Sequence, residues 1–525
     1  MLIPKLLMNA SMNHTKKPAF IDQNRVYTYE QLATKAAKVK RSLINMGISH
    51  GDRVATLLSN CSEYIEILNG AAAMGAILVP LNTRLSVSEI SYILNDAGAS
   101  TLFVGEEFVS FITEIQHNVP SLNGVIFVQN EVNSCDIDNV YSYKKLLEDQ
   151  PDEILTMDNL HEDDIAALFY TSGTTGRPKG VMLTHKNLFC NANHLAIYQR
   201  YHEEEIYLHA APMFHIADFG TILGYTLVGA TQVNLRSFDT KRILQLSEET
   251  RITSAFLIPT MVNMLLNDPD FDKYDTSSLQ KIIYGASPMP VEVIKKAAEK
   301  LPSVQFIQAY GMTEASPVLT IQSGKNHKIH GTEKELKRLA SCGQPIAGVM
   351  LKIMTADGTE AAPGEVGEII ARGPNIMKGY WNLPDETSRA LRNGWYYTGD
   401  VAYRDKDNFY YIVDRAKDMI ITGGENVYSI EVEDVLYRHP AVLECAIIGV
   451  PHEKWGEAVH AFVVTKADYR VSGEEIIAFV RKYLANYKVP KSIEFLSQLP
   501  KTGSGKIFKK ELRSKYWKEK ERNVN

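Results

Sequence analysis

The chain has 525 residues, of which 45% are apolar and 22% are charged. This length predicts about three to five domains or subdomains. The composition is that of a folded globular protein and excludes a disordered chain. The net charge of −6 does not suit a polyanion as the main partner, so we do not expect nucleic-acid binding.

Five cysteines are scattered along the sequence, at positions 61, 135, 190, 342 and 445. None lie close enough for a C-x-x-C metal or redox site, and an odd, sparse set is typical of a reducing compartment. The N-terminal segment is too weakly apolar for a secretory signal. The longest apolar stretch falls short of the roughly 20 residues of a membrane span. We therefore expect a cytoplasmic protein, and leave peripheral membrane contact and a homodimer open.

Helical and extended patterns alternate through the first hundred residues. Apolar residues recur at helical spacing within 28–49, at Leu32, Ala36, Val39, Leu43 and Met46. We expect further helices at 62–75 and 89–98, and buried strands at 52–59, 75–82 and 100–106. This alternation predicts an α/β fold with a doubly wound, mostly parallel sheet.

The alternation returns further along the chain. We expect strands at 205–213, 231–235, 252–259, 281–287 and 304–311, and a helix at 216–228. The last two strands end in turns that contain glycine. In open α/β sheets, ligands bind at this edge.

Near residue 343 the sequence pattern changes to that of short strands and turns, which predicts a β-rich unit over 343–415. A separate α/β segment follows Arg415. We therefore divide the chain into domains at 1–415 and 416–525. The tail from Lys501 onward holds nine Lys/Arg against three acids, which is typical of a solvated terminal helix.

The stretch "YTSGTTGRPKGVMLTH" (170–185) has the composition of a phosphate loop but not its known forms. A Walker loop needs Ser or Thr directly after the lysine, whereas Gly180 follows Lys179 here. Apolar runs on both sides predict a turn between two strands. Its backbone N–H groups, hydroxyls and Lys179 could close over a polyphosphate. The alternative is a polar surface hairpin.

Three later turns carry polar groups that suit a nucleotide. In "AYGMTEAS" (309–316), Tyr310 could stack on a flat ring and Glu314 could bind Mg²⁺. In "YYTGDVA" (396–402), Asp400 could accept hydrogen bonds from sugar hydroxyls. In "KTGSGKIFK" (501–509), Lys506 lies at the tip of a Gly/Ser loop. Taken singly, each is more typical of an ordinary surface turn.

Together and in this order, these turns resemble the motifs of the adenylate-forming superfamily of acyl-CoA synthetases, peptide-synthetase adenylation domains and luciferases. "DRAKDMI" and the region 69–86 also look like motifs of that family. The resemblance covers nearly the whole chain. It implies a large N-terminal domain and a small, mobile α+β C-terminal domain. It also implies an enzyme that activates a carboxylic acid with ATP and Mg²⁺ as an acyl-adenylate, transfers the acyl group to coenzyme A, and releases AMP and pyrophosphate.

The resemblance also implies roles for matching residues. The β- and γ-phosphates of ATP would meet Thr171, Ser172, Gly173, Thr174, Thr175, Gly176 and Lys179. The adenine would be framed by Gly285, Ala286, Ser287, Ala309 and Tyr310. The α-phosphate, Mg²⁺ and ribose would be contacted by Thr313, by Glu314, and by Asp400 with Arg415.

Further roles concern the acid, the thiol and the domain movement. Lys506 would bridge the substrate carboxylate and the α-phosphate region, and His215 would lie at the wall of the acyl pocket. Lys417 would be the hinge residue. Gly423 and Gly424, in "TGGEN", would let the pantetheine of coenzyme A approach the backbone closely.

The acid itself is weakly specified by the sequence. The amino-acid-activating branch usually has an Asp where this chain has His215, which disfavours an amino acid, although Asp218 lies nearby. Ala217, Gly220 and Gly224 are small and would leave room for an acyl chain, so we favour a medium- or long-chain fatty acid. The alternatives are an aryl acid, the loading of a carrier protein, and a non-catalytic nucleotide-binding homologue.

Overall fold

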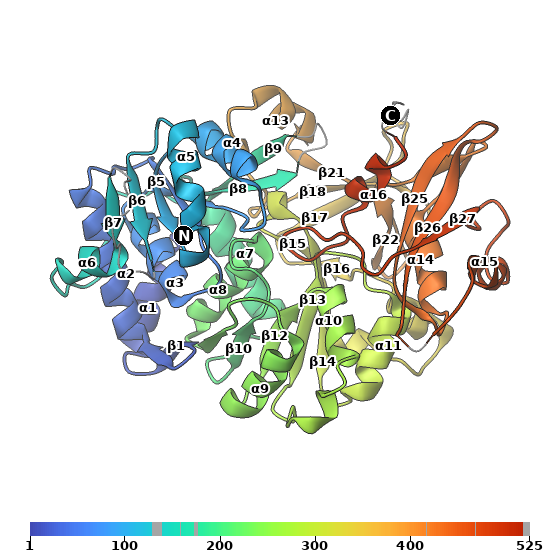
Figure 1. The fold of residues 1–525 in the computed structure, drawn as a ribbon, viewed down its shortest axis with the longest axis horizontal. Coiled ribbons are helices and arrows are strands. Elements are labelled where there is room, and N and C mark those ends of the chain that lie inside the picture. The colour runs from blue at the N-terminus through green and yellow to red at the C-terminus, as the bar shows by residue number, and fades with distance from the viewer. Residues whose placement is uncertain (129–138, 158, 173–176, 416, 468, 518–525) are drawn as a thin grey trace.

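The structure is a computed structural model that describes residues 1–128, 139–157, 159–172, 177–415, 417–467 and 469–517. Four β-sheets organise the described residues (Figure 1). The N-terminal sheet (blue) lies at one side of the molecule and the C-terminal sheet (orange) at the other. The carboxyl ends of the central strands face the region between these two sides, where the candidate site lies.

The N-terminal sheet has eight strands, in the order β19-β9-β8-β4-β3-β5-β6-β7. Its inner strands are parallel, whereas β8, β9 and β19 pair antiparallel. The strands are β3 (Arg53–Leu57), β4 (Ile77–Pro80), β5 (Ala99–Val104), β6 (Gly124–Phe127), β7 (Val140–Ser142), β8 (Ile165–Ser172), β9 (Pro178–Thr184) and β19 (Gly379–Tyr380). The helices between these strands are α3 (Ser62–Ala73), α4 (Val87–Ala97), α5 (Ile112–Asn118) and α6 (Tyr143–Glu148).

The second sheet has nine strands, in the order β16-β15-β14-β13-β12-β10-β11-β1-β2. The strands are β1 (Pro18–Asp22), β2 (Arg25–Thr28), β10 (Ile206–His209), β11 (Thr231–Asn234), β12 (Ser254–Leu257), β13 (Lys281–Gly285), β14 (Gln305–Gly311), β15 (Val318–Gln322) and β16 (Gln344–Pro345). The helices that connect them are α7 (His185–Tyr198), α8 (Ile216–Val228), α9 (Thr240–Thr250), α10 (Pro259–Leu266), α11 (Val291–Lys300) and α12 (Glu333–Arg338). The six strands in the order β14-β13-β12-β10-β11-β1 are parallel to one another, which confirms the predicted doubly wound architecture, whereas β15 and β2 pair antiparallel at either end of this run.

Several details differ from the sequence-based expectation, among them strands β4 and β12, which are shorter than predicted. Helix α2 (Tyr29–Asn45) ends four residues before 49 because Gly47 adopts φ +84°, which a helix cannot continue. Strand β10 is shorter than predicted. The first 28 residues, for which we expected no element, form helix α1 (Pro4–Asn13) and the β1–β2 hairpin. Strand β1 pairs in parallel with β11, so it joins the second sheet although it precedes the first in the chain.

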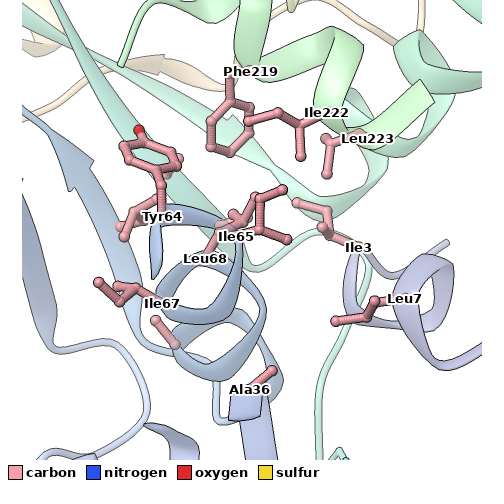
Figure 2. Close-up of a cluster of buried hydrophobic side chains, with 14 of the residues drawn as sticks. Ile3, Leu7, Ala36, Tyr64, Ile65, Ile67, Leu68, Phe219, Ile222 and Leu223 are labelled. Carbon is pink, nitrogen blue, oxygen red and sulfur yellow. The ribbon is translucent and has the colours of Figure 1, made fainter. Parts of the chain in front are cut away.

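Helix α8 is fixed by the core of the N-terminal part. Figure 2 shows side chains of α1, α3 and α8 packed together. They include Ile3, Leu7, Ile65, Leu68, Phe219 and Ile222, each at most 2% exposed. Burial of each such side chain contributes about 1.5–3 kcal/mol. This packing holds the start of α8, where His215 lies.

The third sheet is β-rich, as predicted, and precedes the change of fold near residue 415. It contains β17 (Met350–Met354), β18 (Gly367–Arg372), β20 (Leu391–Arg392), β21 (Trp395–Arg404) and β22 (Tyr410–Arg415), and α13 (Pro384–Ala390) lies beside it. The last sheet contains β23 (Ile420–Thr422), β24 (Glu425–Val427), β25 (Val442–His452), β26 (Gly456–Thr465) and β27 (Ser492–Phe495). It carries α14 (Ser429–Tyr437), α15 (Gly473–Arg481) and α16 (Lys509–Ser514). We keep the domain division at 415/416 as a proposal.

The basic tail is not the solvated helix that its charge pattern suggested. Residues 501–507 form a tight hairpin, closed by a bridge between Lys501 and Ile507, and between there and residue 517 only α16 is helical. Lys509 is held by Glu433 at 2.7 Å. Buried partners therefore decide the conformation of this tail. Among the described residues, every helix is too short or too polar to cross a membrane.

Candidate active site

One cavity of about 2030 Å³ gathers most of the predicted site residues. It opens at the carboxyl ends of β13 and β14, and the hairpin 501–507 closes it from the C-terminal side. The predicted residues that line it are Thr171, Lys179, His215, Ala286, Ser287, Ala309, Tyr310, Thr313, Glu314, Asp400, Arg415, Lys417 and Lys506. Segments more than 300 residues apart in the chain therefore meet at one site.

Some predicted residues are placed elsewhere. Gly285 ends β13 beneath the cavity, where a Cβ atom would lie 2.1 Å from the carbonyl oxygen of Ala309. Glycine is therefore required by the packing of β13 on β14, and we assign it no direct contact with adenine. Ser172 ends β8, and Gly173, Thr174, Thr175 and Gly176 lie outside the described residues.

The predicted turn between two strands is confirmed by β8 and β9, which pair antiparallel up to Ser172 and Pro178. Lys179 follows on β9 and points toward α13, where it forms an ion pair with Glu386. Its ammonium also lies 5.3 Å from the centre of the Tyr380 ring. The lysine that we assign to the phosphates of ATP is thus paired with a carboxylate.

Glu314 presents a single carboxylate to the cavity, just after β14. The Tyr380 hydroxyl donates a hydrogen bond to its Oε1 at 3.0 Å. Burial raises the pKa of Glu314. No three His, Cys, Asp or Glu side chains of the described residues cluster as a metal site. Mg²⁺ fits Glu314 nevertheless, because this ion takes one or two carboxylates and completes its shell with substrate phosphates and water.

Asp400 lies at the bulged part of β21 and is 6% exposed. The Tyr310 hydroxyl donates to its Oδ2 at 2.8 Å, and Arg415 Nε lies 3.4 Å from its Oδ1. Burial raises the pKa of Asp400, and the charge of Arg415 acts in the opposite direction. The position of Asp400 is thus fixed by an aromatic hydroxyl and a cation.

Lys506 enters the same cavity from the C-terminal hairpin. The hairpin is tight: the Thr502 N–H donates to the Lys506 carbonyl at 2.7 Å. Burial, followed by the charge of Arg415, lowers the pKa of Lys506 to about 8, while Asp400 and Glu314 oppose this shift. Two cations and two carboxylates therefore influence one another here.

His215 caps the N-terminus of α8. Its Nδ1 accepts a hydrogen bond from the Ala217 N–H at 3.2 Å. Burial, and then the charge of Lys506, lowers the pKa of His215 to about 3. The ring is therefore neutral near pH 7, and because Nδ1 accepts, Nε2 carries the proton. His215 thus offers the cavity a hydrogen-bond donor rather than a base.

Asp218 is not available to a substrate ammonium group. It is fully buried, and Tyr207 and His209 bind its two oxygens at 2.9 and 2.7 Å. The opposite nitrogen of His209 contacts Gln232 at 2.9 Å. The Asp218 carboxylate therefore belongs to an internal network behind α8, which removes the reason for leaving an amino-acid substrate open.

The expectation that small residues of α8 widen the acyl pocket is wrong for two of the three. A Cβ atom on Gly224 would lie 2.7 Å from the Tyr201 ring, and one on Gly220 would lie 3.2 Å from Pro317. These glycines admit close packing of neighbouring side chains. Ala217 does line the cavity, one turn before Thr221 on the same helix.

Gln199, which sequence reasoning missed, lines the cavity at the end of α7. It is 1% exposed, and its Oε1 accepts from the Tyr201 hydroxyl at 2.7 Å. Its Nε2 has no hydrogen-bond partner within the described part of the chain. Tyr201 stacks on Tyr225 of α8, with ring centres 3.8 Å apart. A buried amide donor is therefore available beyond Thr221, at the far end of α8 from His215.

Gly423 and Gly424 lie away from the cavity. They form the exposed turn between β23 and β24, with φ of +60° and +87°. A Cβ atom on Gly424 would meet no atom within 4 Å. Lys506 therefore lines the cavity in this structure, whereas the turn with Gly423 and Gly424 lies outside the cavity.

Comparison with known proteins identifies the family. The profile of the AMP-binding enzyme family matches residues 8–381, and that of the AMP-binding enzyme C-terminal domain matches residues 431–506. Feruloyl-CoA synthase of Amycolatopsis sp is 38% identical over 93% of this chain and 94% of its own length. The long-chain-fatty-acid–CoA ligase of Bacillus subtilis (strain 168) is 35% identical over 97% and 94%.

A solved structure of similar overall fold supports the same assignment. The anthranilate CoA ligase AuaEII, in complex with anthranoyl-AMP, superposes with a TM-score of 0.90 at 28% identity, covering 98% of this chain and 97% of that one. With matching profiles over both parts and CoA ligases among its relatives, the chain belongs to the AMP-binding enzyme family of the adenylate-forming superfamily and is an AMP-forming acid–thiol ligase.

Proposed function

We propose that the protein converts an aryl carboxylic acid bearing an oxygen substituent into its CoA thioester. In the first step, a carboxylate oxygen attacks the α-phosphorus of ATP, and the bond from that phosphorus to pyrophosphate breaks. In the second step, the sulfur of CoA attacks the acyl carbon, the bond to AMP breaks, and the thiol proton leaves. The observation that carries the two-step chemistry is Lys506, delivered by the C-terminal hairpin into the cavity that contains Glu314 and Asp400.

The first step brings two anions together, so cations must offset their repulsion. Lys506 would contact the carboxylate and the α-phosphate region, and Lys179 with Thr171 would bind the outer phosphates. Thr313 would contact the α-phosphate, and Glu314 would hold the Mg²⁺, which supplies further positive charge when bound. Ala286, Ser287, Ala309 and Tyr310 would frame the adenine, and Asp400 with Arg415 would bind the ribose.

The second step requires a different arrangement of the C-terminal part. Gly423 and Gly424 would have to reach the cavity to admit pantetheine, and Lys506 would have to leave it. We assign the hinge to Lys417, which lies between β22 and β23. We assign no general base, because a thiol with a pKa of about 8.5 is already partly ionised near neutral pH.

The proposed acid class rests on Gln199 and Thr221. Thr221 lines the cavity, and its hydroxyl donates to the Asp218 carbonyl at 2.7 Å, so the hydroxyl could only accept a further hydrogen bond from a substrate. Gln199, a cavity-lining residue, would supply an N–H donor. A plain alkyl chain would leave this donor unsatisfied, at a cost of about 1–3 kcal/mol. A phenol or methoxyphenol oxygen would satisfy it. The cavity near the start of α8 is walled by Phe169 and Phe214, which suits a flat ring.

A medium- or long-chain fatty acid is the second candidate. The apolar residues Leu195, Phe256 and Ile283 line the cavity and would contact an alkyl chain. The fatty acid ligase of Bacillus subtilis is nearly as similar to this chain as the feruloyl enzyme.

Mass spectrometry of the products tests the proposal. The protein is mixed with ATP, Mg²⁺, CoA and equal amounts of 4-hydroxycinnamate, cinnamate, octanoate, palmitate and alanine. We expect AMP and the hydroxycinnamoyl thioester as the main products. Fatty acyl-CoA as the main product would select the second candidate. Acyl-AMP without a thioester would move the acceptor to a carrier protein, and no AMP from any acid would refute the proposed reaction.

A further inference from the structure

The C-terminal part is held against the N-terminal part by side chains that bind main-chain carbonyls. Asn263 Nδ2 donates to the carbonyl of Leu443 at 2.9 Å. Thr260 Oγ1 donates to the carbonyl of Gly505 at 3.1 Å, and Arg84 Nη1 donates to that of Thr502 at 3.1 Å. All three donors belong to the N-terminal part and all three acceptors to the C-terminal part.

The first contact uses a local irregularity of β25. The register of β25 with β26 shifts between Val442 and Glu444, so Leu443 is the extra residue of a bulge and does not pair with β26. Strand β25 is also an edge of its sheet. The Leu443 carbonyl is therefore available to Asn263, which lies on the second turn of α10.

The other contacts hold the turn that carries Lys506. Thr260 is at the start of α10 and lies beneath Gly505, whose φ is +84°. Gly503 is pressed against Asn82, since a Cβ atom there would lie 2.1 Å from Asn82 Oδ1. The turn is thus contacted at Thr502 and Gly503 by residues that follow β4, and at Gly505 by a residue that follows β12.

We propose that Thr260 and Asn263, assisted by Arg84, form a latch that selects the adenylate-forming arrangement. They are positioning residues: they act through the backbone of the segment that carries Lys506. The proposal rests on the proposed function. All three contacts must break when the C-terminal part rotates to bring in Gly424, so the latch favours the first step and opposes the second.

The test is the variant Thr260→Val/Asn263→Leu, assayed in each half-reaction separately. Pyrophosphate release from ATP and acid should fall about fivefold or more, as expected for two lost hydrogen bonds. Thioester formation from synthetic acyl-AMP and CoA should stay constant or become faster. An equal fall in both half-reactions would show a merely structural role and overturn the latch, as would no change in either.

Matched controls come from hydrogen bonds within the N-terminal part. Asn193 donates to Phe189 within α7, and Thr250 donates to Leu246 within α9. Asn193→Leu and Thr250→Val should therefore leave the ratio of the two half-reaction rates unchanged. A changed ratio in these controls would mean that general destabilisation, not the latch, alters it.

A readout independent of activity separates this inference from the proposed function. Lys506 is partly buried in the latched arrangement, so trypsin should cut after it slowly. The Thr260→Val/Asn263→Leu variant should be cut after Lys506 about fivefold faster. Mass spectrometry of the fragments measures the cleavage rate. A wild-type protein without either half-reaction would refute the proposed function, and unchanged cleavage in the variant would refute the latch.

Discussion

At Lys506, the surroundings of the side chain disfavour the protonated form that the proposed reaction requires. Burial and Arg415 lower its pKa to about 8, well below the usual 10.5 of lysine. The shift means that the unfolded chain holds this proton more tightly between pH 8 and 10.5. The folded state is therefore favoured as the pH rises through that window. Activity should change in the opposite direction, because only the protonated form offsets the repulsion of two anions.

We expect kcat/KM for adenylate formation to fall as the pH rises above about 8, with Lys506 in its charged form below that pH. Pyrophosphate release between pH 6 and 10 measures this directly. Lys506→Arg, which stays protonated throughout, should lack the decline. The same decline in the arginine variant would show that another group controls the pH dependence.

Gln199 is the residue at which the acid class can be tested. Gln199→Leu should lower kcat/KM for 4-hydroxycinnamate about tenfold and leave octanoate unchanged or improved, because the lost amide serves only an oxygen substituent. The substitution also leaves the Tyr201 hydroxyl without its acceptor, so it is made together with Tyr201→Phe.

Asn193→Leu is the matched control for Gln199, since its amide donates within α7 to Phe189. It should leave the preference between the two acids unchanged. An equal loss of both acids in the Gln199→Leu/Tyr201→Phe variant would contradict the assignment of Gln199 to substrate recognition.

At the scale of elements, α13 and β9 are joined by an ion pair that a nucleotide must replace. Glu386 on α13 holds Lys179 on β9, and Lys179 in turn holds the pKa of Glu386 below its usual range. Glu386 also contacts Arg389 of the same helix at 2.9 Å. On the proposed function, the phosphates of ATP would compete with this carboxylate of α13 for the lysine.

We therefore expect Glu386→Gln to lower KM for ATP by about threefold, because Lys179 no longer has to leave a carboxylate. Steady-state kinetics at saturating acid and CoA would measure this change in the KM for ATP. Arg389→Gln removes a neighbour of Glu386 that does not contact Lys179, and should have little effect. A higher KM for ATP in the glutamine variant would instead indicate that Glu386 positions the lysine productively.

At the scale of the whole molecule, the proposed function requires two arrangements of the C-terminal part, one for each step. Lys506 lines the cavity while Gly424 is exposed at the tip of its hairpin. On the proposed function, the two groups would serve the cavity in different arrangements. Substitutions at these two positions should therefore have complementary effects.

We expect Gly424→Leu to block thioester formation by about 10²-fold or more while pyrophosphate release survives, since leucine is strained at positive φ and obstructs close approach of CoA. Lys506→Ala should do the reverse, with a loss of about 10²–10³-fold in adenylation. Half-reaction assays on both variants provide the comparison. Loss of adenylation in the Gly424 variant would place the CoA path elsewhere.

Much of the fold follows from local sequence signals. The alternation of buried strands and helices predicted both parallel sheets, and the turns with Lys179, Glu314, Asp400 and Lys506 were identified before their convergence was visible. What could not be predicted depends on contacts between distant segments. No spacing links Tyr380 to Glu314 or Glu386 to Lys179. Gly224 is an example: only its contact with Tyr201 shows that this glycine serves close packing and does not widen the acyl pocket.

The pairing of β1 with β11 has a consequence for how the chain is made. The partner of β1 is synthesised about 210 residues later, which at roughly 5–20 residues per second is a delay of about 10–40 s. Until then, a hairpin with a fully buried Phe20 in the finished protein has no sheet to join. The N-terminal strand of the nascent chain therefore lacks its native sheet partner through more than a third of synthesis.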